Sequence, residues 1–83
     1  MVDTSAQEGK IGERMQRRPV DSSSIVSVGY DEAAHELEIE FQGGRVYRYR
    51  SVPAAAYRLL LRAPSIGEYV NHQIKPRFTA SRV

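Results

Sequence analysis

The chain contains 83 residues, enough for one small domain and too few for two. Its formal net charge is +2 and 41% of its residues are hydrophobic, which suits a small globular domain with a polar extension. The absence of cysteine excludes disulfides, catalytic thiolates and zinc–thiolate sites, so a hydrophobic core must stabilise the fold. No apolar run reaches the roughly 20 residues of a membrane-spanning helix, and the N-terminus lacks the apolar region of an export signal. We therefore expect a cytoplasmic monomer with no membrane association.

Residues 1–20 carry mixed charges and only scattered large apolar side chains. Such a segment cannot bury enough apolar surface to offset the entropy lost on ordering. We predict a disordered N-terminal tail over 1–20, a folded domain over 21–78 and a short C-terminal tail over 79–83.

Three strands are expected within the folded domain. Residues 25–30 are rich in β-branched and aromatic side chains, and residues 36–41 alternate strictly between glutamate and large apolar residues. Strict alternation is typical of an antiparallel strand with one buried face. The glycine pair at 43–44 predicts a hairpin turn that leads into a third strand over 45–50.

The length of this hairpin turn determines which way Tyr47 and Tyr49 point. A two-residue turn directs both tyrosines toward solvent, where they could stack on RNA bases. A three-residue turn over 42–44, with a glycine in a G1 bulge, instead places Tyr47 opposite Ile39 and Tyr49 opposite Leu37 on the core side. We favour the three-residue turn because it also pairs opposite charges on the outer side.

In the favoured register, Glu38 lies opposite Arg48 and Glu36 lies opposite Arg50. Together with Glu40, these glutamates could in principle form an acid–base pair or a metal site, because they share one strand face. A metal site needs converging donors from more than one element, and the sequence offers no second ligand cluster. We therefore favour cross-strand ion pairs and expect no metal and no cofactor.

Catalytic motifs are also missing from the sequence. His35 lies among acids in a predicted turn and His72 occupies a polar helical position, so both are expected to be solvated surface residues. The chain has no nucleophile elbow, P-loop or dinucleotide-binding fingerprint. We expect no catalytic residues and no enzymatic activity.

Two helices should follow the strands. The first is expected over 54–63, between two prolines. Ser65 and Glu68 form the pattern of a capping box, which begins a second helix that ends before Pro76. Gly67 lies in its first turn, which indicates a close approach to its backbone. The order β-β-β-α-α predicts an α+β domain in which both helices pack on one face of a three-stranded antiparallel meander.

The charges are segregated along the chain. Residues 25–44 contain five acids and no bases, whereas residues 45–83 contain eight bases and one acid. Ten of the twelve bases are arginine, which suits phosphate contacts and stacking on nucleotide bases. A solvated face without a partner is the alternative. The predicted RNA-binding set consists of Arg58, Arg62, Asn71, Lys75 and Arg77.

Several spaced motifs occur together in the chain. They are Ser23-Ser24-Ile25, Gly29-Tyr30-Asp31, Leu37-x-Ile39-x-Phe41, Tyr47-x-Tyr49, Val52-Pro53, and Ala63-x-Ser65-x-Gly67-x-Tyr69-x-Asn71 with Ile74. From residue 23 to about 78 the chain resembles the KTSC family, named after the C-terminal region of some lysyl-tRNA synthetases and also found as free-standing bacterial proteins. The resemblance implies RNA binding by association only, and it supplies no catalytic residue.

Five residues of these motifs are candidates for a structural or a binding role: Tyr47, Tyr49, Ser65, Gly67 and Asn71. Gly67, Asn71 and Lys75 are expected to share one helical stripe. The structural interpretation is a helix cap, a close helix contact and a buried amide, and the alternative is a ligand site.

Two functional hypotheses follow from the sequence. The first is a non-enzymatic module that binds structured RNA such as tRNA through a basic helical face. The second is a protein-interaction module that docks a partner on the sheet edge or on the outer face of the sheet.

Overall fold

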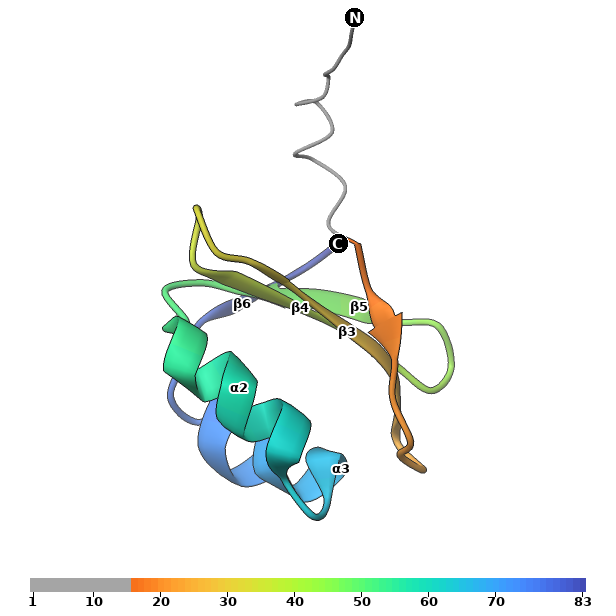
Figure 1. Cartoon of the computed structure of the whole chain (residues 1–83). Coiled ribbons are helices and arrows are strands. Elements are labelled where there is room, and N and C mark those ends of the chain that lie inside the picture. Colours follow the sequence, from red (N-terminus) through yellow and green to blue (C-terminus); the bar gives the residue numbers. More distant parts are fainter. Residues whose placement is uncertain (1–15) are drawn as a thin grey trace, which may run out of the picture.

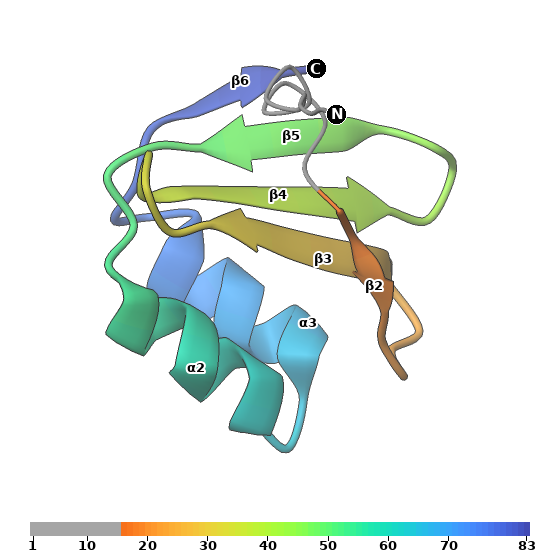
Figure 2. The same cartoon turned by 45° about the horizontal axis from the view of Figure 1, so that its top comes forward.

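A five-stranded antiparallel sheet carries the helices on one of its faces (Figure 1, Figure 2). The computed structural model describes residues 16–83. The strands, in their order across the sheet, are β2 (Arg18–Pro19), β3 (Ile25–Asp31), β4 (Glu36–Phe41), β5 (Val46–Tyr49) and β6 (Ala80–Arg82). The helical layer consists of α2 (Ala54–Arg62), α3 (Ile66–Tyr69) and the π-helical segment η2 (Val70–Ile74). The α+β class is as predicted, and the predicted three-stranded meander is the centre of a wider sheet.

The turn between β4 and β5 has the predicted three-residue form. The amide of Phe41 donates to the carbonyl of Arg45 at 2.8 Å, which leaves residues 42–44 as the loop. Both loop glycines have positive φ, 97° and 91°, a conformation that glycine adopts without steric penalty. Each tyrosine of β5 consequently lies opposite an apolar residue of β4. Tyr49 is only 4% exposed.

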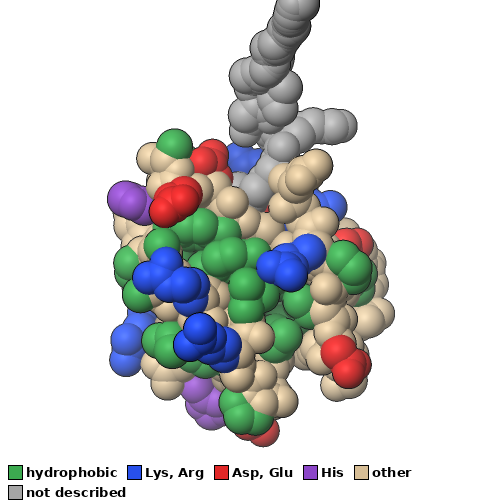
Figure 3. Space-filling view, in the orientation of Figure 1, with side chains coloured by type: hydrophobic (Ala, Val, Ile, Leu, Met, Phe, Trp, Pro, Cys, Tyr) green, Lys and Arg blue, Asp and Glu red, His purple; other side chains and the backbone are tan. Residues whose placement is uncertain are grey.

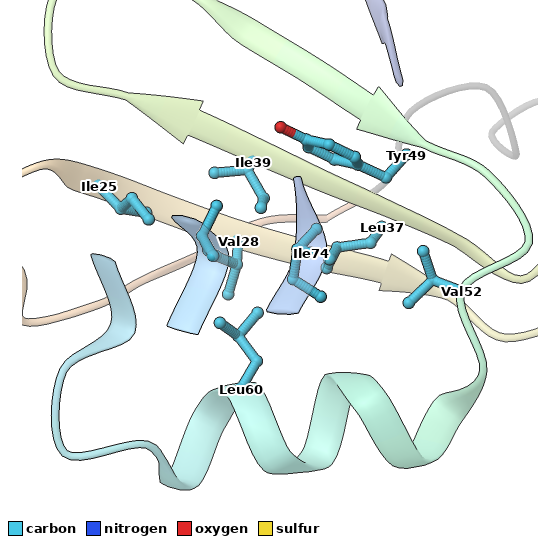
Figure 4. Close-up of a cluster of buried hydrophobic side chains, with 9 residues drawn as sticks. Ile25, Val28, Leu37, Ile39, Tyr49, Val52, Leu60 and Ile74 are labelled. Carbon is cyan, nitrogen blue, oxygen red and sulfur yellow. The ribbon is translucent and has the colours of Figure 1, made fainter. Parts of the chain in front are cut away.

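The hydrophobic core fills the space between the sheet and the helical layer. Figure 4 shows Leu60 of α2 pointing toward the strands, with the Tyr49 ring near Ile39. Burial of each aliphatic side chain contributes roughly 1.5–3 kcal/mol. The nine buried apolar residues are Ile25, Val28, Leu37, Ile39, Tyr49, Val52, Leu60, Val70 and Ile74.

A β-bulge interrupts the alternation of β3. Ile25 and Val28 are three residues apart, yet both side chains are buried in the core. The pairing of β3 with β4 shifts register between Ile25 and Ser27, which adds one residue to β3. The bulge therefore lets both apolar residues face the helices while Ser27 faces the opposite side.

The two predicted tails are too long. β2 pairs with β3, and β6 pairs with β5 at the other edge of the sheet. The prediction of a disordered tail over 1–20 is therefore wrong for residues 18–19, and that of a tail over 79–83 is wrong for residues 80–82; residues 1–15 lie outside the described part of the chain. Edge strands of two or three residues carry no readable alternation, because their pairing depends on backbone hydrogen bonds and close packing.

The helical layer begins as predicted. α2 follows Pro53, and the Ser65 hydroxyl accepts a hydrogen bond from the amide of Glu68 at 3.2 Å, as expected of an N-cap. The expectation for Gly67 is also confirmed, because a Cβ there would clash with the hydroxyl of Ser24. This close contact joins the first turn of α3 to the segment that leads into β3.

Candidate nucleic-acid interface

The outer face of the sheet, opposite the helices, holds a neutralised ion network. The Glu38 carboxylate accepts from Arg17 Nη1 at 2.7 Å and from Arg48 Nη2 at 2.9 Å. Its side chain is 4% exposed, whereas each arginine is about one-third exposed. The predicted pairing of Glu38 with Arg48 is confirmed. Arg17, which we expected in a disordered tail, is the second partner.

The predicted pairing of Glu36 with Arg50 is wrong. Arg50 Nη2 donates instead to the hydroxyl of Ser81 at 2.7 Å, and Glu36 Oε1 lies 3.9 Å from Arg48 Nε. The reason is that β6 adds beside β5 and brings Ser81 within reach of Arg50. Glu40 lies at 4.0 Å from Arg17 and accepts from the hydroxyl of Ser27 at 2.9 Å.

The remaining cations are free of ion pairs within residues 16–83. Among these residues, only Arg17 and Arg48 bridge to carboxylates. Figure 3 shows blue side chains over the region of α2, with red side chains toward the margins of that face. The cations that form no ion pair with any described residue are Arg18, Arg45, Arg50, Arg58, Arg62, Lys75, Arg77 and Arg82.

The predicted pair Arg58 and Arg62 lies exposed on α2. Arg58 is near Tyr30, whose hydroxyl donates to the carbonyl of Val52 at 2.5 Å. Burial raises the pKa of Tyr30, Glu32 raises it further, and the positive charge of Arg58 opposes both effects. The two arginines thus form a cationic site on the α2 side of the helical layer, which we call the α2 cations.

The other three predicted residues lie at or beyond the second helical segment. Asn71, Lys75 and Arg77 are all exposed. The amide of Lys75 donates to the carbonyl of Val70 at 2.8 Å, which is the hydrogen bond of a π-helical turn. The expected stripe of Gly67, Asn71 and Lys75 stays a prediction, and Lys75 Nζ lies 5.2 Å from the centre of the Phe41 ring. The structure distributes the five predicted residues over two regions.

The motif residues divide between the two interpretations. Ser65 caps a helix and Gly67 provides a close contact, so the structural interpretation holds for both. Asn71 is not the buried amide of that interpretation, because its side chain is exposed. Tyr49 belongs to the core, whereas Tyr47 is only half-buried and packs edge-to-face against Phe41, with ring centres 5.9 Å apart.

Tyr47 and Lys75 both border a cavity of about 440 Å³ on the helical side of β5, which we call the aromatic cavity. It extends from the end of β4 to β6, where the helical layer leaves the sheet partly open. Sequence reasoning missed this site, since the alternation of β4 indicates a core position for Phe41 and no motif singles out the other lining residues. The cavity is lined chiefly by Phe41, Arg45, Tyr47, Tyr49, Lys75 and Phe78.

Two kinds of feature, a metal-ligating cluster and a membrane-spanning helix, are not found in residues 16–83. No group of three or more His, Asp or Glu side chains in this range is arranged to hold a metal ion. None of the helices in the same range has the length and apolar character needed to span a membrane. His35 and His72 are exposed, as predicted.

Comparison with solved structures and known proteins identifies relatives of this fold. A crystal structure of a KTSC domain protein from Yersinia pestis matches with a TM-score of 0.79 and 40% identity, covering 83% of this chain and 97% of the other. A protein of Tsukamurella paurometabola is 46% identical over 63 residues, which is 76% of this chain and 94% of the relative. A lysine–tRNA ligase of Nostoc punctiforme is 38% identical over 58 residues, which is 70% of this chain but only 10% of the ligase.

The family model of the KTSC domain matches residues 21–78. These are the residues that form β3, β4, β5 and the helical layer, and they contain most of the aromatic cavity. The resemblance found in the sequence is therefore confirmed: the chain belongs to the KTSC domain family.

Proposed function

We propose that this KTSC domain is a non-enzymatic module that binds RNA of tRNA-like structure, acting as a monomer in the cytoplasm. The observation that carries the proposal is the set of cations that form no ion pair within residues 16–83. Strand glutamates are neutralised on the outer face, whereas the α2 cations, Lys75 and Arg77 are exposed and form no ion pair with any described residue. A polyanion is the partner class that such a surface attracts.

The residue types on this surface support RNA in particular. Arginine contacts phosphate with two parallel hydrogen bonds and stacks on bases. Asn71, which is also exposed, offers both a donor and an acceptor to a base edge. One relative is a lysine–tRNA ligase, which supports this choice by association.

The alternative, a protein partner on the sheet, has less support. The outer face is polar, and its buried carboxylate is already satisfied by two arginines. The β6 edge is only three residues long. Short edges and satisfied charges disfavour β-strand addition and docking on this face.

Salt dependence of tRNA binding tests the proposal. For single-stranded regions the slope of log affinity against log salt is about −0.7 per contacted phosphate, so four contacts give about −3. Replacing Arg58 and Arg62 by glutamine should therefore reduce the slope to about −1.5. The Ala33→Glu, Ala34→Glu variant changes the net charge equally but at an exposed turn, and it should keep the original slope. Equal slopes for the two variants would refute binding through α2, and absence of tRNA binding at low salt would make a protein partner the leading hypothesis.

A further inference from the structure

The lining of the aromatic cavity passes from buried residues at the floor to exposed residues at the rim, as in a ligand site. Tyr49 is buried at its floor, Phe41, Tyr47 and Phe78 form half-buried walls, and the exposed Arg45 and Lys75 lie at the rim. The volume of about 440 Å³ is within the range of roughly 300–1,000 Å³ found for small-molecule sites. Apolar aromatic walls with cations at the opening are complementary to a planar ring that carries a negative group.

The tyrosine hydroxyls add polar groups to this lining. Within residues 16–83 the hydroxyl of Tyr30 is hydrogen-bonded, whereas those of Tyr47 and Tyr49 have no partner. Figure 4 shows the Tyr49 hydroxyl pointing away from Val52, along the sheet. Burial raises the pKa of Tyr49, and Tyr47 raises it further, so the hydroxyl stays protonated and can donate as well as accept.

The rim lysine lies beside an aromatic wall of the cavity. Lys75 directly follows the π-helical segment, its amide donates to the carbonyl of Val70, and its ammonium group lies over the face of Phe41. π-helical turns occur frequently at functional sites. The rim charge thus lies next to an aromatic wall, where a phosphate attached to a stacked ring would lie.

We propose that the aromatic cavity receives the base of one unpaired nucleotide, with its phosphate against Arg45 and Lys75. This proposal rests on the proposed RNA-binding function and specifies an unpaired nucleotide as the part of the RNA that the domain recognises. A base in a duplex is stacked on both faces and cannot enter, so the cavity selects unpaired nucleotides. A free nucleoside monophosphate has the same chemistry, and the experiment separates it from RNA.

Amide chemical shifts provide the test. The protein is titrated with adenosine, with adenosine monophosphate, with a single-stranded octanucleotide RNA and with a fully paired RNA. We expect the unpaired RNA and the monophosphate to shift the amides of Phe41, Tyr47 and Phe78, and the paired RNA to leave them in place.

Two variants separate the hydroxyl contact from the phosphate contact. Tyr47→Phe keeps the ring but removes one hydroxyl, and should weaken binding of all unpaired ligands about 2- to 10-fold. Tyr57→Phe removes a hydroxyl outside the cavity and should have no effect. Lys75→Gln should weaken the monophosphate about 2- to 5-fold and leave adenosine unchanged, whereas Arg18→Gln should change neither. Lys75 is exposed, so its substitution tests the site without disturbing the fold.

The outcomes distinguish this inference from the proposed function. RNA binding with shifts on α2 but none at the cavity would overturn the inference and leave the proposed function intact. Amide shifts at the cavity with the monophosphate, together with no binding of RNA, would overturn the proposed RNA-binding function and leave a site for free nucleotides. No shift with any ligand would overturn both proposals.

Discussion

Removing the Arg17 side chain should destabilise the domain, because this residue fastens β2 to the outer face of the sheet. Arg17 Nη1 lies 2.7 Å from Glu38 Oε1, and Arg17 Nε donates to the Ser27 hydroxyl at 3.1 Å. A buried carboxylate that loses all partners costs about 3–5 kcal/mol. In Arg17→Ala, however, Glu38 keeps Arg48 at 2.9 Å. We therefore expect the smaller loss of about 1.5–3 kcal/mol typical of a hydrogen bond to a charged group.

Urea denaturation followed by circular dichroism measures this loss. Arg18→Ala is the matched control, because Arg18 is exposed, forms no ion pair within residues 16–83, and keeps its backbone pairing with Val28. The control should change the free energy of unfolding by less than about 0.5 kcal/mol. Combining Arg17→Ala with Glu38→Gln should reveal a coupling energy within about 0.5–3 kcal/mol. If Arg17→Ala and Arg18→Ala behave alike, the docking of β2 described above is incorrect.

Three further predictions concern the sheet. Tyr49→Ala should lower the free energy of unfolding by about 3–5 kcal/mol in urea denaturation, since it empties a core position, and a loss below 1 kcal/mol would contradict its burial. Gly29→Ala should cost about 1–3 kcal/mol because its Cβ would lie 2.6 Å from the carbonyl oxygen of Gln16, and unchanged stability would show that the residues before β2 do not cross Gly29. The raised pKa of Tyr49 means that the folded state favours the protonated phenol, so this stabilisation is complete below the unfolded pKa of about 10 and is lost as pH rises through the folded pKa. The melting temperature should therefore fall less steeply above pH 10 for Tyr49→Phe than for the unmodified chain. Equal pH dependence of the two melting temperatures would refute a contribution from the Tyr49 hydroxyl.

The centre of the fold was predictable because each local signal agrees with the others. The alternation of β4 selects its buried face, the glycines define the loop, and aromatic–aliphatic pairs match only in one register. The helix starts were predictable for a similar reason. Pro53 and Ser65 act on the first backbone turn alone, and their effect does not depend on the rest of the chain.

The edges of the fold were not predictable from local patterns. β2 is positioned by two contacts of the residues before it. Gly29 has no side chain, so the backbone of Gln16 can approach it, and Arg17 donates to the carboxylate of Glu38, which is 21 residues away in sequence. The bulge in β3 breaks the alternation that would otherwise report which face is buried. Both features depend on contacts distant in sequence, and a single sequence does not report such contacts.

The candidate site was predictable in residue type and only partly in position. Composition indicates a basic surface, and all five predicted residues are exposed. One of them, Lys75, has its ammonium group over the ring of Phe41 at the end of β4. Helical spacing cannot anticipate that contact, because it joins residues 34 positions apart in sequence and depends on how the helical layer packs on the sheet.

The hairpin register links the electrostatics of the domain to the aromatic cavity. Along β5, Arg48 points outward to neutralise Glu38, while Tyr47 and Tyr49 point inward to the cavity. Because side chains alternate with a period of two, a slip by one residue would exchange these roles. It would bury a guanidinium among apolar side chains and expose both phenol rings, which is strongly unfavourable. The hydrogen bond from the Phe41 amide to the Arg45 carbonyl closes a three-residue turn, which is incompatible with that slip, so the same backbone geometry maintains both the neutral outer face and the cavity on the helical side.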